Sequence, residues 1–446
     1  MQLPVPPDVV RAAYAELVVT DLAEARRFYV DLLGFAVSAE SDTALYLRGS
    51  DELIHHNLIL RAGPEAAAAR LAYRVRTAAD VDRAEAFFAA LGSRTARVPA
   101  GVTPGVGEAV RAEDPLGFTV EFFFEAAYAE RLQQRYDLRR GAEPARLDHF
   151  NIVVSDVRAA YEYYTSLGFG LSETIEDGNT LYAAWMFRKQ TVHDVAFTGG
   201  PGPRLHHVAF FVHESHQVLR ICDILGSLHQ ESMIERGPGR HGVSNAFYVY
   251  LRDPDGHRVE LYTSDYYTGD PDHPVLRWSV RDPRRRDFWG HAVVPSWYTE
   301  ASTVLDLDDR PRPLQAEKQT AEVTVGADGF TRLPARLYLL DWQLARGLLG
   351  AEHLLVEFAH RGLRDLGHER PVLRYLPARH LAVQEAGELG GVGLGPGAQH
   401  HAGQRPLAPA LVRDAVPGLR RCPPPRPRAA WPGRRPGSSP SCPSPG

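Results

Sequence analysis

Histidine and carboxylate side chains recur on predicted strands in the middle of the chain. His149 begins one apolar strand, Glu260 lies within another, and His206 and His207 begin a third strand between them in the sequence. Neighbouring residues of a strand point to opposite faces, so only one of His206 and His207 can face the same cavity as the other two residues. Two imidazoles and one carboxylate are the facial triad that suits Fe(II) or Mn(II) and leaves positions open for substrate and oxygen. The sequence therefore predicts a metal site, with the choice between His206 and His207 open.

The elements that must position these residues occur twice along the chain. A predicted strand leading to Asp21 and a helical pattern ending at Gly34 are repeated as a strand leading to Asp156 and a helical pattern ending at Gly168, an offset of 134–135 residues. Aspartate can cap the start of a helix and glycine can end one. Both copies therefore predict a strand followed by a helix, and a repeat of this length indicates a duplicated domain.

An Asp-Pro-x-Gly turn recurs in both copies, at 114–117 and at 253–256, and an apolar strand follows each turn. Each half of each copy reads as a strand, a helix and several further strands. We therefore expect an α+β fold of two domains, each of paired βαβββ modules, with an irregular C-terminal tail. The expected boundaries are 10–135 for a metal-free domain, 145–270 for a catalytic metal-binding domain, 271–330 for a segment closing the active site, and 331–446 for the tail.

The first copy lacks the histidines of the second. When Arg70 is aligned with Arg204, the three ligand positions of the first copy hold Tyr14, Tyr73 and Glu121. Two tyrosines cannot replace two imidazoles at a ferrous site, so we expect the first domain to be metal-free. A single histidine on a strand is usually a hydrogen-bonded structural residue. Three ligand types at matched module positions in one copy favour a metal site instead.

Charge and composition exclude several other classes of protein. Lys and Arg number 50 against 55 Asp and Glu, and a net charge of −5 does not favour a nucleic-acid-binding protein. No apolar run approaches the roughly 18 residues of a membrane span, and the N-terminus lacks the pattern of a secretory signal. Three cysteines cannot build a disulfide framework, so a cytoplasmic location is expected. Residues 396–446 hold 13 prolines, eight arginines and one acid, which predicts a segment without a packed core.

Several long motifs connect the chain to a known family. They are RLDHFN at 146–151, YAAWMFRKQTVHD at 182–194, ERGPGRHGVSN at 235–245, DPDGHRVE at 253–260, DYYTGD at 265–270, RRDFWG at 285–290 and PSWYTE at 295–300. Residues 1–330 resemble the type I extradiol catechol dioxygenases of the vicinal-oxygen-chelate superfamily, whose fold pairs βαβββ modules as in glyoxalases and bleomycin resistance proteins. The resemblance stops near residue 330, after which no match is recognised.

The resemblance implies a metal set, a reaction and an assembly. The implied ligands of one Fe(II) or Mn(II) per subunit are His149, His207 and Glu260. The implied substrates are O2 and the catechol 3,4-dihydroxyphenylacetate, which would be opened beside its two hydroxyls to 5-carboxymethyl-2-hydroxymuconate semialdehyde in aromatic catabolism. The family also implies a homo-oligomer, a tetramer. Implied catalytic residues are an acid–base histidine, a tyrosine that hydrogen-bonds the substrate and an amide lining the oxygen pocket: His193, Tyr250 and Asn151.

The substrate's side chain would need cationic partners because a carboxymethyl catechol is an anion. The resemblance implies that the tail is bound by Arg236, His241, Arg285 and Arg286, with Trp185 packing beside it. The basic run 281–286 could instead be a solvated stretch, so we expect only one or two of its arginines to act. Alternatives left open are an extradiol enzyme for another catechol, a metal-free small-molecule binding protein, and an isomerase or epimerase on the same scaffold.

Overall fold

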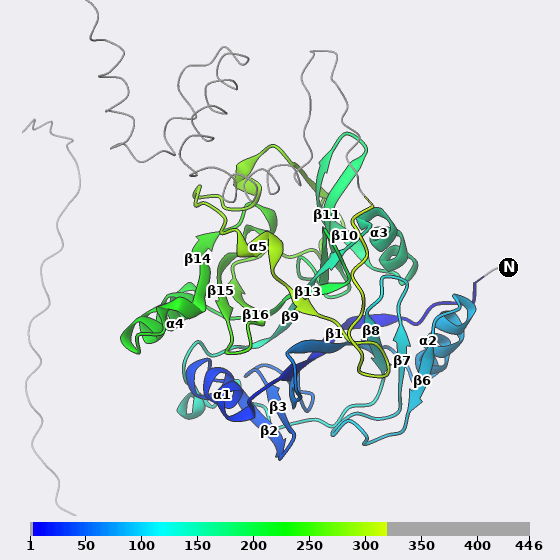
Figure 1. Cartoon of the computed structure of the whole chain (residues 1–446), viewed down its shortest axis with the longest axis horizontal. Helices are drawn as coiled ribbons and strands as arrows, with labels where there is room; N and C mark the ends of the chain where they lie inside the picture. Colours follow the sequence, from blue (N-terminus) through cyan, green and yellow to red (C-terminus); the bar gives the residue numbers. More distant parts are fainter. Residues whose placement is uncertain (1–2, 319–446) are drawn as a thin grey trace, which may run out of the picture. The chain divides into compact units, whose positions relative to one another are not determined.

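The computed structural model describes residues 3–318, and the predicted tail at 331–446 lies outside them together with the end of the 271–330 segment. Two mixed β-sheets with few helices make up this part of the chain (Figure 1), so the expected α+β class is confirmed. The first sheet, within the described residues, has eight strands in the order β2-β3-β4-β1-β5-β8-β7-β6. Its elements are β1 (Val9–Val19), α1 (Leu22–Arg26), the π-helix η1 (Arg27–Leu32), β2 (Ala36–Ser41), β3 (Ala44–Arg48), β4 (Leu58–Ala62), β5 (Ala67–Val75), α2 (Ala79–Ala90), β6 (Thr95–Val98), β7 (Ala109–Glu113) and β8 (Thr119–Phe123).

The second sheet repeats this plan and adds strands from the C-terminal segment. Its strand order is β14-β15-β16-β13-β9-β12-β11-β10-β17, with β18 paired to β13. A short 3-10 turn, η2 (Tyr136–Leu138), lies in the connection between the sheets. The elements are β9 (Arg146–Val154), α3 (Val157–Ser166), β10 (Gly170–Asp177), β11 (Thr180–Phe187), β12 (Val195–Gly199), β13 (Arg204–Phe211), α4 (Ser215–Ser227), η3 (Glu231–Met233), β14 (Ile234–Arg240), η4 (Val243–Asn245), β15 (Phe247–Arg252) and β16 (Arg258–Thr263).

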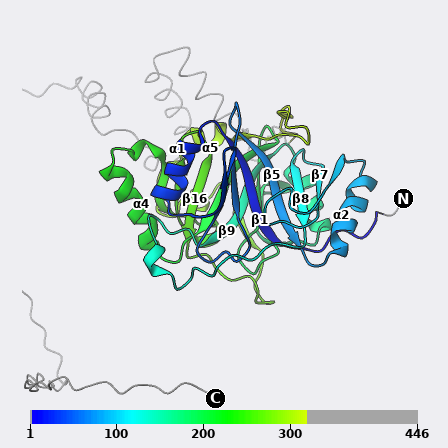
Figure 2. The same cartoon turned by 90° about the horizontal axis from the view of Figure 1, so that it is seen from below.

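Each sheet is built from two βαβββ modules, as the repeat predicted. In the first sheet β1 to β4 with α1 form one module and β5 to β8 with α2 form the other, joined by antiparallel pairing of β1 with β5. In the second sheet β9 pairs with β13 in the same antiparallel way. Figure 2 shows strands of both sheets across the centre, with α4 and α2 at opposite ends.

The predicted helix signals act as caps. The Asp21 carboxylate accepts from the backbone N–H groups of Ala23 at 2.8 Å and Glu24 at 3.1 Å, and Asp156 accepts from that of Ala159 at 2.9 Å. These bonds satisfy N–H groups that have no partner inside the helix. Gly34 has a φ of +90°, and a Cβ there would lie 2.0 Å from a backbone carbonyl oxygen. The start and stop signals of both helices are therefore confirmed.

The two Asp-Pro-x-Gly turns are also confirmed and they tie the domains together. Asp114 accepts from the N–H groups of Leu116 and Phe118, and Asp253 accepts from that of His257 at 2.7 Å. The other carboxylate oxygen of Asp253 accepts from the Tyr29 hydroxyl of the first domain at 3.0 Å. A turn of one domain thus contacts a helix of the other, and the core is continuous across the pair.

The C-terminal segment returns along the second sheet. Its described elements are β17 (Leu276–Ser279), which pairs with β10, the turn η5 (Pro283–Arg285), the short helix α5 (Ser296–Thr299), and β18 (Ser302–Thr303), which pairs with β13. Through β18 the segment is anchored next to the strand that carries His206 and His207. In residues 3–318 no helix has the length and apolar character needed to cross a membrane.

Asp114 generates a prediction about pH. Burial, only partly offset by the backbone N–H groups of the turn, raises the pKa of its carboxyl to about 7, and one oxygen has no hydrogen-bond partner within the described residues. A carboxyl whose folded pKa is raised stabilises the fold below its unfolded pKa near 4, and that stability is lost as pH rises through the folded pKa. We expect Asp114→Asn to keep the turn. The unfolding free energy of the variant minus that of wild type should be a few kcal/mol larger at pH 8 than at pH 5, since one pKa unit is about 1.4 kcal/mol.

The measurement is urea unfolding of both proteins at pH 5 and pH 8. The exposed carboxyl variant Asp42→Asn serves as the control and should follow wild type at both pH values. An Asp114→Asn difference that does not change with pH would contradict the assigned burial effect.

Candidate active site

Three side chains from three strands of the second sheet meet at one point. His149 comes from β9, His207 from β13 and Glu260 from β16, and all three are buried. The Nε2 atoms of His149 and His207 lie 3.2 Å apart, and each lies 3.1 Å from Oε2 of Glu260. Two imidazole lone pairs and a carboxylate packed this closely repel one another unless a cation lies among them. The donor set therefore fits a divalent metal ion, with two nitrogens and one oxygen on one side.

For Glu260 and His207 the electrostatics agree with this assignment. Burial alone would raise the pKa of Glu260, but its close contacts with His149 and His207 outweigh burial and hold the pKa well below its usual value. Burial lowers the pKa of His207 to about 4, only partly opposed by Glu260, so its imidazole is neutral near pH 7. An ionised carboxylate and a neutral imidazole are the forms that bind a metal.

The second domain settles which histidine of the doublet faces the site. His207 joins His149 and Glu260, whereas Nε2 of His206 faces the backbone carbonyl of Trp297 at 2.9 Å. On the other side, Nδ1 of His149 lies 3.0 Å from Oδ2 of Asp148, which also accepts from the Tyr262 hydroxyl at 2.6 Å. Both candidate ligand histidines thus have a partner behind them that fixes the ring, Asp148 for His149 and His206 for His207.

The first domain places different residues at the same points. In β13 and β16, Ala209 pairs with Glu260, and in β5 and β8, Ala72 pairs with Glu121. Counting back two residues from each alanine puts Arg70, not Tyr73, at the position of His207. The expectation for Tyr73 was wrong because the aligned strands are offset by three more residues than the match of Arg70 with Arg204 implied.

At the position equivalent to the triad, the first domain has an ion-pair cluster around Arg70. Its guanidinium lies 2.8 Å from Glu16 and 3.4 Å from the fully buried Glu121, and Nε of Arg111 lies 2.6 Å from Glu121. The Tyr14 hydroxyl, at the position of His149, donates to the same carboxylate. Guanidinium groups carry only donors and have no lone pair for a metal. Among residues 3–318, both clusters of possible metal ligands lie in the second domain.

A cavity of about 270 Å³ opens in front of the triad of the second domain. Every candidate site residue predicted from the sequence lines it, and so do several that the sequence did not single out. The lining residues that matter below come from β9, β11, β13, β14, β15, β16, the loops after β11 and β14, and the C-terminal segment: His149, Asn151, Trp185, His193, His207, Arg236, His241, Tyr250, Glu260, Tyr262, Arg285, Arg286, Trp297 and Tyr298.

Two polar residues lie beside the triad with unused hydrogen-bonding atoms. The His193 ring, in the loop before β12, lies 3.7 Å from the His149 ring, centroid to centroid. Within the described residues, His193 Nδ1 and Asn151 Oδ1 are buried and have no hydrogen-bond partner. Burial, followed by the neighbouring His149, lowers the pKa of His193 well below its usual value. Unpaired buried polar atoms are costly, so their place in a cavity wall points to a ligand.

Tyr250 and His241 form the next layer of the wall. The Tyr250 hydroxyl lies 2.9 Å from Nε2 of His241, and Nδ1 of His241 faces the backbone carbonyl of Arg286 at 2.7 Å. Because a carbonyl only accepts, Nδ1 carries the proton and Nε2 accepts from the tyrosine. Arg236 donates to the same carbonyl at 2.6 Å, and its guanidinium stacks over the Trp297 ring at 4.4 Å.

The basic run divides as the sequence suggested. Arg285 is buried and, with Arg286, lines the cavity, whereas Arg281 and Arg284 are exposed and pair with the carboxylates of Asp177 and Asp282. Burial, followed by repulsion from Arg286, lowers the pKa of Arg285 to about 10, so it stays charged at neutral pH. The cavity therefore has metal-ligand chemistry at one end and positive charge in its wall.

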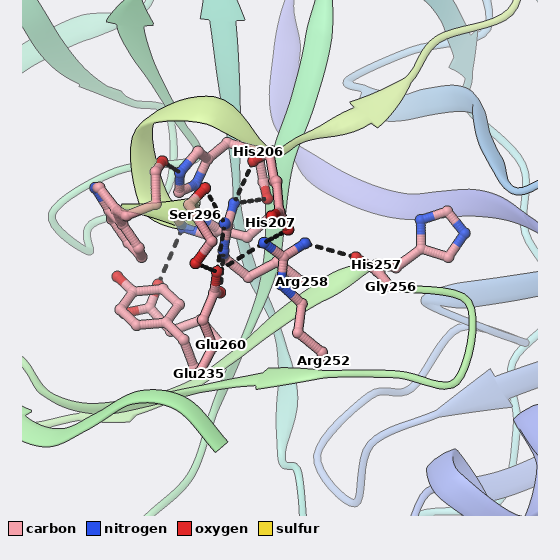
Figure 3. Close-up of polar contacts among 12 residues, drawn as sticks. His206, His207, Glu235, Arg252, Gly256, His257, Arg258, Glu260 and Ser296 are labelled. Carbon is pink, nitrogen blue, oxygen red and sulfur yellow. Dashed lines mark hydrogen bonds and ion pairs between the residues drawn. The ribbon is translucent and has the colours of Figure 1, made fainter. Parts of the chain in front are cut away.

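The sequence did not predict the supporting role of four residues at this site. Asp148 precedes a ligand, His206 precedes another, and Tyr262 stands two residues after the third, so adjacency was an available signal. Trp297 lay within a recognised motif but carried no assigned role. Figure 3 shows a further one, Arg258, whose guanidinium lies between Glu235 and the strand of His206 and His207.

Comparison with known proteins identifies the class. The family model of the Glyoxalase/Bleomycin resistance protein/Dioxygenase superfamily matches residues 11–122 and 146–261, one match in each domain, and the chain belongs to this superfamily. The chain is similar to the homoprotocatechuate 2,3-dioxygenase of Brevibacterium fuscum in complex with 3,4-dihydroxyphenylacetate, at 58% identity and a TM-score of 0.69 over 70% of this chain and 100% of that chain.

Two further relatives agree with this placement. The homoprotocatechuate 2,3-dioxygenase of Arthrobacter globiformis is 59% identical, with a TM-score of 0.69, over 70% of this chain and 98% of that chain. A manganese-dependent 2,3-dihydroxybiphenyl 1,2-dioxygenase of Geobacillus genomosp. 3 is 28% identical over 297 residues, which are 63% of this chain and 94% of the relative. The resemblance to extradiol dioxygenases predicted from the motifs is confirmed.

The triad generates a prediction about metal retention. Glu260→Gln removes the negative ligand and His149→Ala removes an imidazole, and we expect each to weaken Mn(II) binding by more than the roughly 10–100-fold that loss of an outer partner costs. Tyr250→Phe, which alters the same cavity without touching a ligand atom, should keep the metal. Metal content after dialysis against a chelator measures this, and full retention in Glu260→Gln would remove that residue from the ligand set.

Proposed function

We propose that this protein is an extradiol dioxygenase that opens the ring of 3,4-dihydroxyphenylacetate. The reaction breaks the ring bond beside the two hydroxyls and inserts both atoms of O2, giving 5-carboxymethyl-2-hydroxymuconate semialdehyde. The observation that carries the proposal is a single cavity that joins two histidines and a glutamate to buried arginines. The high identity to two homoprotocatechuate 2,3-dioxygenases supports the choice of substrate.

His149, His207 and Glu260 would hold one Fe(II) or Mn(II), and the manganese-dependent relative supports Mn(II) as one of the two. When bound, such an ion lowers the pKa of a catechol hydroxyl and brings substrate and oxygen into contact. The chain supplies the rest of the site. Asp148 and Tyr262 hold the His149 ring in place, and the walls of the cavity exclude bulk water from the ring.

Three residues are placed to handle protons and oxygen atoms. Tyr250 presents a hydroxyl to the cavity, where it can hydrogen-bond a catechol oxygen, and His241 behind it fixes the direction of its proton. His193 presents a neutral imidazole, which can take a proton from a substrate hydroxyl and return it later. The free Oδ1 of Asn151 shares the face of His149 by strand alternation and lines the oxygen side of the cavity.

The carboxylate of the substrate would meet the cationic part of the wall. Arg285 and Arg286 supply guanidinium groups, and Arg236 and His241 stand next to them around the carbonyl of Arg286. A guanidinium can bind a carboxylate through two parallel hydrogen bonds. Trp185 on β11 also lines the cavity and offers a flat apolar surface for the ring or its methylene.

We also propose the organisation of the chain. Residues 10–135 would form the domain without metal, 145–270 the catalytic domain, and 271–330 a segment that closes the active site. The ion-pair cluster around Arg70 supports the first assignment, and the position of Trp297 and Tyr298 in the cavity wall supports the last. By resemblance to its family the protein would work in the cytoplasm as a homotetramer.

The test compares a carboxylated catechol with a neutral one. Purified protein loaded anaerobically with Fe(II) or Mn(II) should consume O2 and form a yellow semialdehyde from 3,4-dihydroxyphenylacetate. Arg285→Met should lower kcat/KM for this substrate about 10–100-fold, because a hydrogen bond to a charged group contributes roughly 1.5–3 kcal/mol. The same variant should leave 4-ethylcatechol cleavage nearly unchanged.

Arg284→Met is the matched control, since this exposed neighbour pairs with Asp282 outside the cavity. Cleavage of neutral catechols in preference to 3,4-dihydroxyphenylacetate by wild type would reassign the substrate. Metal binding without any oxygen uptake would leave a small-molecule binding protein as the better description.

A second prediction concerns His193. His193→Asn keeps a polar group in the wall but cannot exchange a proton near neutral pH, so metal retention should match wild type while kcat falls about 100-fold or more, the range of general acid–base catalysis. The loss should appear in the steps after substrate binding, leaving the substrate Kd measured without oxygen close to wild type. Unchanged turnover would show that His193 carries no proton in the reaction.

A further inference from the structure

His206 is a buried histidine that takes no part in the cavity wall. Its ring lies behind His207, with the two Nδ1 atoms 2.7 Å apart. Its other nitrogen, Nε2, lies 2.9 Å from the backbone carbonyl oxygen of Trp297, and the two rings pack edge to face with centroids 4.4 Å apart. His206 therefore bridges a candidate metal ligand and helix α5 of the C-terminal segment.

Donor and acceptor roles along this bridge follow from one fixed point. The Trp297 carbonyl can only accept, so Nε2 of His206 must carry the proton. His207 faces the other ligands through Nε2, so that atom needs a free lone pair and the ring proton must be on Nδ1. The 2.7 Å contact is then a bond donated by Nδ1 of His207 to Nδ1 of His206. Only this arrangement of protons gives every donor and acceptor between His207 and Trp297 a hydrogen-bond partner.

The backbone around the Trp297 carbonyl, which ends this series of hydrogen bonds, is itself held firmly. Arg258, whose side chain is fully buried, donates to the backbone carbonyls of Ser296 at 3.2 Å and Glu300 at 3.1 Å, on either side of Trp297. It also donates to the carbonyl of His206 at 3.0 Å and pairs with both oxygens of Glu235 (Figure 3). One guanidinium thus fixes helix α5 against the strand that carries His206 and His207.

We propose that His206 is a positioning residue, through which the C-terminal segment fixes the tautomer and orientation of the metal ligand His207. Its acceptor nitrogen holds His207 in the tautomer that offers Nε2 to a metal, and the Trp297 carbonyl sets the tautomer of His206. Ligand His149 is held by a carboxylate of its own strand, whereas His207 depends on a segment about 90 residues further along the chain. The inference rests on the proposed metal-dependent function.

Three substitutions separate the two hydrogen bonds of His206. His206→Asn keeps an acceptor at the place of Nδ1 but cannot reach the Trp297 carbonyl. His206→Gln can donate to that carbonyl but has no acceptor at the place of Nδ1, and His206→Phe keeps only the ring. We expect the Mn(II) Kd, measured by chelator competition on the full chain, to rise about 10–100-fold in the Gln and Phe variants. The Asn variant should stay close to wild type.

Two further readouts complete the test. Because His206 does not line the cavity, KM for 3,4-dihydroxyphenylacetate in the Mn(II)-saturated Gln variant should match wild type. Urea unfolding of the metal-free proteins reports any variant that fails to fold, and the Asn and Gln pair then carries the comparison. Weaker Mn(II) binding in the Asn and Gln variants beside wild-type binding in the Phe variant would mean that ring packing matters and the hydrogen bond does not, which overturns the proposal.

Different results would overturn the proposed function and the role of His206. A wild-type chain that does not retain Mn(II) would overturn the proposed function and this inference with it. A wild-type chain that retains Mn(II) and cleaves the catechol, beside Gln and Phe variants with the same Kd, would overturn the role of His206 alone.

Discussion

The antiparallel pairing of β9 with β13 is the constraint on which the candidate site depends. Its register sets Ala209 opposite His149 and His207 opposite Asn151, and the parallel pairing of β13 with β16 sets Glu260 beside Ala209. Residues opposite one another in a sheet share a face, so three ligands far apart in the sequence face one cavity. A slip of one residue would turn each side chain to the other face.

The same pairing in the first domain shows two solutions to one electrostatic problem. Glu121 and Glu260 occupy equivalent positions and both are buried, so each carboxylate needs a positive partner to offset the cost of leaving water. In the second domain the candidate ligands His149 and His207 leave that role to a metal ion. In the first, Arg70 brings the positive charge on a side chain, with Arg111 beside it. Unlike a metal ion, a guanidinium offers no open coordination position for a substrate. The first site therefore contributes packing, whereas the second can take part in chemistry.

Local features of this protein were predictable from the sequence and long-range ones were less so. Asp21, Asp156 and the two Asp-Pro-x-Gly turns bond to backbone groups a few residues away, and the duplicated modules followed from them. The ligand set was reached through family motifs, because strand alternation left His206 and His207 equivalent. The position of Tyr73 was misjudged because register depends on pairing with β8, not on the spacing between similar strings. His206 and Trp297 are 91 positions apart in the sequence, and no local pattern near either residue predicts their contact.

The cluster around Arg70 also bears on how such a duplicated protein can change over generations. Metal binding in the first domain would need histidines at positions 14 and 70 together. Replacing Arg70 alone leaves Glu16 and Glu121 buried beside each other with one guanidinium fewer, and replacing Tyr14 alone leaves the arginine in the way. Each single step is destabilising, so selection would meet a barrier before any benefit. A single substitution at either position therefore does not convert the ion-pair cluster of the first domain into a metal site, and the two domains keep different roles.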